Sequence, residues 1–316
     1  MKREGMMSRL KQVSCSMDEP VACYFLNAFK HSIKMNKIIA CIALILILTS
    51  CNLSKEVDID LPKYSSQPVV ECYLIPGQRY ELLLTHSNSF FDPLTVDNPA
   101  AYLASLLETG ATIRIMHGID TIALEEKVSL NSQTGFISNY SNEAIVPEDF
   151  TGEFSLSITL KNGSIITAAS HIPASVGFDS IRVEYNNPEK QRAILFAYYR
   201  DDQSSVDYYR RMIHVSSLDS VPQQDYTIDD KINTTENVVF GAFYERRDKK
   251  PVVGDTMIFS LYHITEDYYR FSQSKDNANV ANGNPFGQPG QIKSNVTGPS
   301  NPIGIFTGFV PRRDTL

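Results

Sequence analysis

The sequence predicts a mainly β protein with two antiparallel β-sandwich-like (immunoglobulin/fibronectin-like) blocks and one or two short helices. Most of the chain after residue 66 consists of short runs that alternate apolar and polar residues, the pattern of half-buried strands. Turn signals separate these runs, and the clearest is Asn162-Gly163, which lies between two alternating segments. Only two segments have helical spacing. No period of roughly 20–50 residues recurs, which argues against a solenoid or a propeller.

An export signal precedes the part of the chain that is expected to fold. Lys37 is followed by an apolar run of 11 residues, Ile38–Leu48, far shorter than the ~20 residues of a membrane-spanning helix. Leu48, Thr49 and Ser50 then lead directly into Cys51. This tetrapeptide resembles the bacterial lipobox, in which the cysteine is acylated and becomes the mature N-terminus. We therefore expect a lipid such as palmitate on Cys51. The alternatives are an ordinary signal peptide and a buried apolar helix that ends in cysteine.

The expected domain organisation follows from this signal. Residues 1–34 are interpreted as a mis-called or extended leader, because Met35-Asn36-Lys37 already makes a complete start. Residues 35–50 form the lipoprotein signal peptide, and 51–66 form a flexible tether. Its Lys-Glu and Asp residues resemble an acidic export tag or make only a solvated linker. An N-terminal β-sandwich is predicted over 67–173. A C-terminal β-rich domain with a short helix near 265–278 is predicted over 174–316.

Charge and cysteine content narrow the class of protein. The first 50 residues hold 7 of the 29 Lys and Arg and 3 of the 36 Asp and Glu, so the rest has a net charge of −11. An acidic surface argues against nucleic acid as a partner, and membrane attachment must then come from the lipid. Cys72 is the single cysteine after Cys51, which excludes an intramolecular disulfide and a thiolate metal site in this part.

The N-terminal block contains three pairs of strand signals and one helix signal. Val70, Cys72 and Leu74 share one face of the first strand, so we expect Cys72 to be buried and inert. A short helix with Asn98 as its candidate cap is expected in the long connection after the second strand. The predicted elements are strands over Pro68–Ile75, Tyr80–Thr85, Ala111–His117, Thr121–Val128, Glu153–Leu160 and Ser164–Ile172, and a helix over Ala100–Glu108.

The C-terminal block begins with strands and includes the best helix signal. Thr265 precedes two acidic residues and is the expected helix cap. The tail from Asn279 is rich in Asn, Gly and Pro and is predicted to be irregular. The predicted elements are strands over Phe178–Tyr185, Arg192–Arg200, Asp207–Ser216, Val238–Tyr244 and Thr256–His263, with the second and third joined as a hairpin, and a helix over Thr265–Ala278.

Several short motifs occur in one order along the chain. They are the lipobox, Val69–Leu74, Gly110–Ile113, Thr167–Ala169 with Ile172-Pro173, Asp207–Arg210, and Ser294–Gly298 before Gly304–Phe306. In this order they resemble the Bacteroidota outer-membrane lipoproteins grouped as domain of unknown function 4249, over essentially all of Cys51–Phe309. Pro299–Ile303 departs from the paired glycines frequent in that family. The resemblance implies a secreted, lipid-anchored, β-rich protein, often found beside a TonB-dependent transporter, and it supplies no catalytic residue.

No catalytic or metal-binding motif is present, so no catalytic residue, cofactor or metal ligand is assigned. The chain has no H-E-x-x-H, G-x-S-x-G, G-x-x-x-x-G-K-[ST] or G-x-G-x-x-G sequence. Asp229–Asn233 resembles a calcium loop only faintly, because the turn glycine and the distal Glu are missing. The five histidines after Cys51 are scattered, mostly at strand ends, and are interpreted as structural or surface residues: His86, His117, His171, His214 and His263.

Two repeated patterns have both a functional and a structural interpretation. Tyr-Tyr-Arg occurs at Tyr198–Arg200, Tyr208–Arg210 and Tyr268–Arg270, and could form a stacking platform for a ligand or simply alternate between strand faces. Asp followed by Ser or Thr and an apolar residue matches the Bacteroidota O-glycosylation pattern, or marks a turn before a strand. The candidate acceptors of this second pattern are Thr121, Ser180, Ser220 and Thr256.

The function expected from the sequence is that of a non-catalytic accessory or binding lipoprotein. It would be lipid-anchored at the outer membrane, facing the periplasm or the cell exterior, and work beside a TonB-dependent transporter. Two alternatives remain. One is a surface hydrolase that acts on an imported polymer through an unrecognised pair of carboxylates. The other is a structural or adhesive surface lipoprotein.

Overall fold

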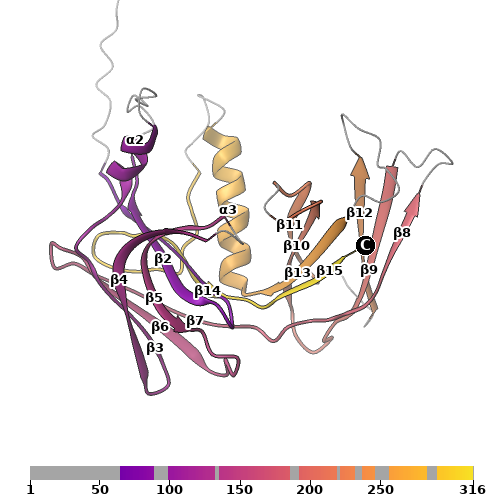
Figure 1. The fold of residues 1–316 in the computed structure, drawn as a ribbon, viewed down its shortest axis with the longest axis horizontal. Helices are drawn as coiled ribbons and strands as arrows, with labels where there is room; N and C mark the ends of the chain where they lie inside the picture. The colour runs from indigo at the N-terminus through magenta and orange to yellow at the C-terminus, as the bar shows by residue number, and fades with distance from the viewer. Residues whose placement is uncertain are drawn as a thin grey trace, which may run out of the picture. The chain divides into compact units, whose positions relative to one another are not determined.

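The computed structural model describes residues 65–88, 99–131, 135–185, 192–218, 221–231, 237–245, 256–282 and 290–315. The lipobox and the tether up to residue 64 lie outside these ranges. Within them the chain is mainly β, with three sheets and two helices (Figure 1). The predicted fold class is therefore confirmed. Neither of these helices is both long and apolar enough to cross a bilayer.

The largest sheet has eight strands in the order β14-β1-β2-β5-β4-β3-β6-β7. Neighbouring strands are antiparallel except for β14 and β1, which are parallel. The sheet buries an apolar core that includes Leu82, Tyr140 and Phe154. The strand bounds are β1 Pro68–Leu74, β2 Arg79–His86, β3 Thr112–His117, β4 Asp120–Leu130, β5 Ile137–Ile145, β6 Glu153–Thr159, β7 Ile165–His171 and β14 Ile303–Gly308.

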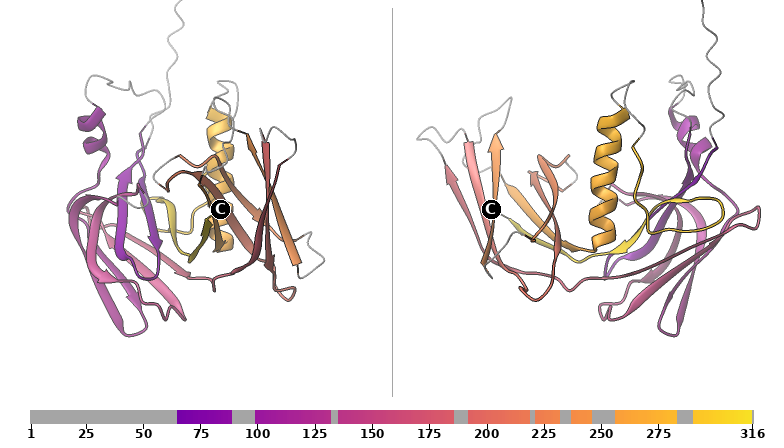
Figure 2. Two further views of the ribbon diagram at one scale, coloured as in Figure 1. Left: turned by 45° about the vertical axis from the view of Figure 1, so that its right-hand side comes forward. Right: turned by 180° about the vertical axis from the view of Figure 1, so that it is seen from behind.

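The two edges of this sheet approach each other. Thr297, which precedes β14, exchanges two backbone hydrogen bonds of 2.9 Å with Thr167 in β7. The sheet therefore curls back on itself, nearly as a barrel does, and the curved strands are visible in both views of Figure 2. Closure of this kind protects strand edges that would otherwise pair with other chains.

The remaining strands form two smaller sheets that pack face to face. One has the order β12-β9-β8 and the other β11-β10-β13-β15. Tyr199, Tyr209, Phe259 and Leu261 belong to their shared core, as expected for a β-sandwich. The bounds are β8 Phe178–Tyr185, β9 Arg192–Arg200, β10 Tyr208–Val215, β11 Gln224–Asp229, β12 Asn237–Glu245, β13 Met257–Ile264 and β15 Pro311–Thr315.

Two helices complete the described part of the chain. Helix α2 spans Pro99–Leu106, close to its predicted range. Helix α3 spans Glu266–Asn282 and is capped as predicted, because the Tyr268 amide donates to Thr265 Oγ1 at 3.2 Å. It lies along the outer face of the four-stranded sheet (Figures 1 and 2), where Gln273 donates to Thr227 Oγ1 in β11.

Two expectations about the C-terminal half are wrong. The strands β9 and β10 do not form a hairpin, since β9 pairs with β8 and β12 while β10 pairs with β11 and β13. The connection 201–205 instead carries the chain from one layer of the sandwich to the other. The tail is also not irregular throughout: residues 290–302 contain no helix or strand, but β14 and β15 follow them. Strands β5 and β11 were not predicted.

The expected burial of Cys72 is confirmed, with the thiol fully enclosed.

Candidate functional site

A cavity of about 360 Å³ lies between the outer face of the β1–β2 edge and the outer face of the four-stranded sheet. Strand alternation builds it. In β1, Val70, Cys72 and Leu74 point into the core of the large sheet, while Glu71 and Tyr73 line the cavity. In β10, Tyr209 and Ile213 enter the sandwich core, while Arg210, Met212 and His214 line the cavity. Each strand therefore stabilises its own core with one face and forms the site with the other.

One wall of the cavity is aromatic. The centroid of the Tyr73 ring lies 5.6 Å from that of Phe136 and 6.0 Å from that of Tyr268, and both pairs pack edge to face. Phe309 packs against these rings, 6.0 Å from Tyr268 and 5.2 Å from Tyr262. Burial raises the pKa of Tyr268 to about 12, so its hydroxyl stays protonated at neutral pH. The wall thus offers flat apolar surface with neutral hydroxyl groups.

Two of the four cationic side chains in the lining are held by carboxylates. Arg210 donates from Nε and Nη2 to Asp225 at 2.8 and 2.6 Å, and from Nη1 to the Tyr268 hydroxyl at 2.6 Å. Burial alone would lower the pKa of Arg210, but Asp225 and the tyrosines raise it overall, so the guanidinium stays charged. Arg79 donates to Glu81 at 3.0 Å and to Glu143 at 3.3 Å. Arg79 and Arg210 are therefore structural parts of the site.

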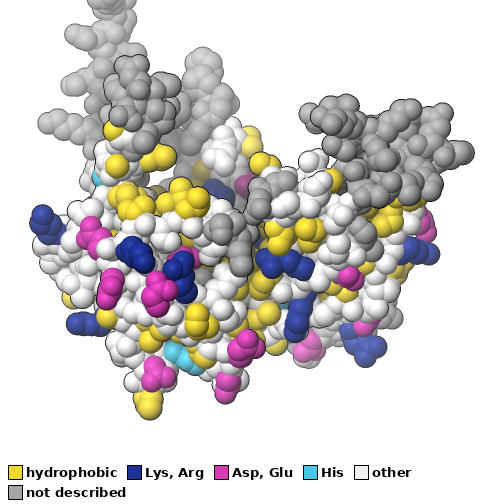
Figure 3. Space-filling model, viewed as in Figure 1, with side chains coloured by type: hydrophobic (Ala, Val, Ile, Leu, Met, Phe, Trp, Pro, Cys, Tyr) yellow, Lys and Arg dark blue, Asp and Glu magenta, His cyan; other side chains and the backbone are white. Residues whose placement is uncertain are grey.

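The other two cations, Lys275 from α3 and Arg313 from β15, are exposed. Neither has a carboxylate partner within the described ranges. The acids of the lining are already engaged, since Glu71 accepts from the Tyr73 hydroxyl and Glu81 from Arg79 and Asn131. Over the visible face of the molecule, by contrast, acidic and basic side chains are interspersed (Figure 3).

His214 adds a buried polar group to the lining. Its side chain is 3 % exposed, and Nδ1 has no hydrogen-bond partner within the described ranges. Burial, together with the neighbouring Arg313 charge, lowers the pKa of His214, so the imidazole is neutral at pH 7. A neutral imidazole can donate or accept one hydrogen bond without adding charge.

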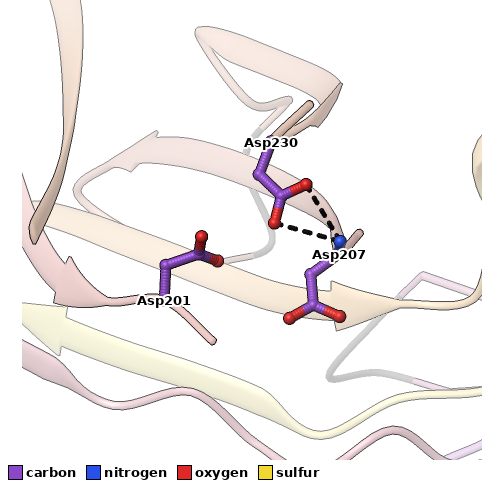
Figure 4. Close-up of side chains that lie close together, drawn as sticks. All are labelled: Asp201, Asp207 and Asp230. Atoms are coloured by element: carbon purple, nitrogen blue, oxygen red, sulfur yellow. Dashed lines mark hydrogen bonds between the residues drawn. The ribbon is translucent and has the colours of Figure 1, made fainter. Parts of the chain in front are cut away.

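A second cluster lies where the chain enters and leaves the four-stranded sheet (Figure 4). Asp201 follows β9, Asp207 precedes β10 and Asp230 follows β11, and one carboxylate oxygen of each lies within 4.8 Å of the others. Asp201 accepts from the Tyr209 hydroxyl at 2.8 Å and from Gln203 at 2.9 Å. Both oxygens of Asp230 accept from the Asp207 amide at 3.0 Å.

The cluster is strained electrostatically. Burial, followed by the charges of Asp201 and Asp207, raises the pKa of Asp230, while the Asp207 amide opposes this shift. His263 lies beside the cluster. Its Nε2 lies 3.4 Å from Asp207 Oδ1, and Nδ1 donates to the Ala174 carbonyl oxygen at 2.7 Å. The three aspartates are the set in the described chain that could hold a hard cation such as Ca²⁺.

The structure places the residues singled out in the sequence at different points. Thr121, Ser180 and Thr256 are exposed. Ser220 and the lipobox, Leu48, Thr49, Ser50 and Cys51, lie outside the described ranges. Of the Tyr-Tyr-Arg motifs, Tyr199 and Tyr209 are core residues, as strand alternation predicts. Arg210 and Tyr268 line the cavity. The structural and the functional interpretation therefore each hold for part of the pattern.

The sequence alone did not predict that the residues of the cavity, or those of the aspartate cluster, would lie together. Asp230 lies in the segment noted for its faint likeness to a calcium loop, and the Asp207–Arg210 motif holds both Asp207 and Arg210. These were the available signals. The other cavity residues around Arg210, such as Tyr73 and Arg313, lie more than a hundred residues away from it along the chain, and only the fold brings them together.

Comparisons with known proteins give one informative match. No curated protein matches the chain. A solved structure of a Salmonella alpha-2-macroglobulin mutant aligns with 84% of this chain at 9% sequence identity and a TM-score of 0.22, and the aligned region is 15% of that protein. The model of the family described as Domain of unknown function (DUF4249) matches residues 54–314. The chain therefore belongs to the DUF4249 family.

Proposed function

We propose that this protein is a lipid-anchored envelope protein that binds a small ligand beside a TonB-dependent outer-membrane transporter and catalyses no reaction. The observation that carries the proposal is the cavity, which combines an aromatic wall with fixed cations. Its volume falls in the roughly 300–1,000 Å³ range of small-molecule sites. Aromatic faces and fixed charges bind a ligand without any proton transfer, so the arrangement suits capture better than chemistry.

The lipobox supports the anchored location. A lipid on Cys51 would confine the protein to the membrane plane, where even a weak contact with a barrel gains from a high effective concentration. Replacing Cys51 with Ala should abolish labelling with tritiated palmitate and release the protein from the membrane fraction. Label and membrane association that persist in this variant would refute the anchoring.

The partner is tested by affinity purification. The full chain, tagged after residue 316, is recovered from gently solubilised outer membranes of its native host, with the Cys51→Ala form as the matched control. We expect a TonB-dependent barrel protein to be enriched with the anchored form only. Equal recovery of the barrel with both forms, or no barrel at all, would contradict the association.

The aspartate cluster favours a second candidate, hydrolysis of an imported polymer. One member of an acid–base pair must hold its proton more tightly than an ordinary carboxyl group does, and burial raises the pKa of Asp230. Asp201 and Asp230, however, are only 5 % and 6 % exposed, and neither lines the cavity. Hydrolysis of a polysaccharide that is lost in Asp230→Asn would favour this candidate, and activity unchanged by that substitution would dismiss it.

A further inference from the structure

We propose that the cavity binds a small organic anion, with Lys275 and Arg313 contacting its carboxylate or phosphate group and the aromatic wall packing against its apolar body. The inference rests on the proposed binding function and names the chemical class of the ligand. It follows from the charge and the shape of the cavity and from a buried polar group in its lining.

The charge of the lining is unbalanced. Four cations and two carboxylates line the cavity. Arg210 is held by the bidentate contact with Asp225, and Arg79 by Glu81 and Glu143. Lys275 and Arg313 remain without a carboxylate within the described ranges. Two cations that share a concave surface repel each other, so an anion between them relieves this repulsion and is attracted by both.

The aromatic wall and the volume of the cavity favour an organic anion over an inorganic one. Tyr73, Tyr268 and Phe309 form a continuous set of ring contacts along the wall. A bare inorganic anion would leave these faces exposed to water, whereas an apolar or aromatic body would cover them. A volume of about 360 Å³ is near the lower end for small-molecule sites, so a small molecule fits better than a polymer chain.

His214 provides the independent observation. A neutral imidazole that is 3 % exposed and lacks a partner for Nδ1 within the described residues is costly in a folded protein. It lines the same cavity as Arg313, the charge that helps to lower its pKa. A buried polar group next to an unpaired cation is typical of a ligand site, because the ligand completes the hydrogen bonding.

The test measures binding of matched fluorinated probes to the full chain by ¹⁹F nuclear magnetic resonance. The protein is held in phosphatidylcholine nanodiscs, and empty nanodiscs provide the background. The probes are 4-fluorobenzoate, 4-fluorophenyl phosphate and the neutral 4-fluorobenzyl alcohol. We expect at least one of the two anions to bind about tenfold more tightly than the alcohol, the effect of one charge-assisted contact.

The variants identify the contacting groups. Lys275→Ala and Arg313→Ala should each weaken binding of the anion about tenfold, and the double variant more than either alone. Arg313→Lys should keep most of the affinity. Lys161→Ala is the matched control, because Lys161 is an exposed cation outside the cavity. All the substituted residues are exposed, and thermal unfolding of each variant checks that the fold is retained.

The outcomes separate this inference from the proposed function. Binding of the alcohol as tight as that of the anions, or an unchanged double variant, would overturn the anionic ligand and leave the binding function standing. No binding of any probe would overturn both. Displacement of the probe in nanodiscs that contain phosphatidylglycerol would identify the anion as a lipid headgroup. Undiminished binding there would identify a free anion, and either result supports the site.

Discussion

Asp230 is a carboxyl group whose ionisation the fold opposes. Its pKa is raised above the ordinary value of 3.8, first by burial and then by Asp201 and Asp207. At a pH between the ordinary pKa, which holds in the unfolded chain, and the raised pKa of the folded protein, the folded protein binds more protons than the unfolded chain. The stability that this carboxyl contributes is therefore fully present below pH 3.8 and is lost as the pH rises through the raised pKa.

An amide at this position should remove that pH dependence. Asp230→Asn keeps the side-chain shape but cannot ionise, so we expect the variant to become more stable relative to the wild type as the pH rises through this window. Urea unfolding at steps from about pH 4 to pH 8 measures the difference. Asp179→Asn, at an exposed position, is the control. Identical pH curves for the wild type and Asp230→Asn would contradict the prediction.

Among the glycines that the structure describes, Gly304 has the least room for a side chain. It has a φ of +132°, and a Cβ atom would clash with the Val70 carbonyl oxygen of the paired strand. We expect Gly304→Ala to destabilise the protein by about 3 kcal/mol or more, because β14 must move away from β1. Gly177→Ala is the control, since no atom lies near its Cβ position. Equal unfolding midpoints for the two variants would show that β14 can adjust.

Individual residues differ in how far the sequence could predict their surroundings. Cys72 was predictable, because strand alternation alone places it with Val70 and Leu74. The aspartate cluster was not. Its members follow or precede three different strands, and their proximity depends on the register that pairs Tyr208 with Asp229. Periodicity identifies the face of a residue but not its partner in another strand.

Among the elements, α3 depends on a cap that is shared with a strand. Thr265 Oγ1 accepts from the Tyr268 amide and lies 3.0 Å from Thr307 Oγ1 in β14, and both hydroxyls are buried. Thr265→Ala removes the cap and leaves the Thr307 hydroxyl without this partner. We expect a loss of about 1–2 kcal/mol in the free energy of unfolding, measured with urea. Thr265→Ser keeps a hydroxyl group and should retain most of the wild-type stability. A loss as large as that of Thr265→Ala would contradict the capping role.

Elements with strong local signals were predicted, and those that depend on distant pairing were not. The hairpin β6–β7 has alternation on both strands and Asn-Gly between them. Strand β5 lacks apolar alternation, because it buries Ser138, Asn139 and Ser141 beside Tyr140. Strand β14 is a short parallel strand whose partner lies more than 200 residues earlier, so no local pattern reveals it. The segment 201–205 looks like a hairpin turn although it links two layers.

At the scale of the whole molecule, β14 joins the two halves of the chain. Phe306 enters the core of the large sheet, while Ile305 belongs to the cluster beneath α3 with Tyr262, Tyr268 and Phe309. A strand near the end of the sequence thus completes the sheet whose other strands, β1 to β7, come from the first half of the described chain. The cavity lies along this junction, with Tyr73 on one side and Arg210 on the other. Its geometry depends on the pairing of β14 with β1.

Removing β14 should therefore unfold more than the tail. Ile305, Phe306 and Phe309 are 0 %, 0 % and 6 % exposed. Truncating buried side chains of this size costs about 2–5 kcal/mol each, so their combined loss approaches the roughly 5–15 kcal/mol that stabilises a typical domain.

A chain that ends at Pro302 should lose protease resistance in both β1–β7 and the four-stranded sheet. A chain that ends at Val310 lacks only β15, whose residues from Arg312 to Thr315 are exposed, and should stay folded. Limited proteolysis of both truncated chains beside the full chain measures this. Normal resistance of β1–β7 in the Pro302 chain would show that the large sheet is stable without β14.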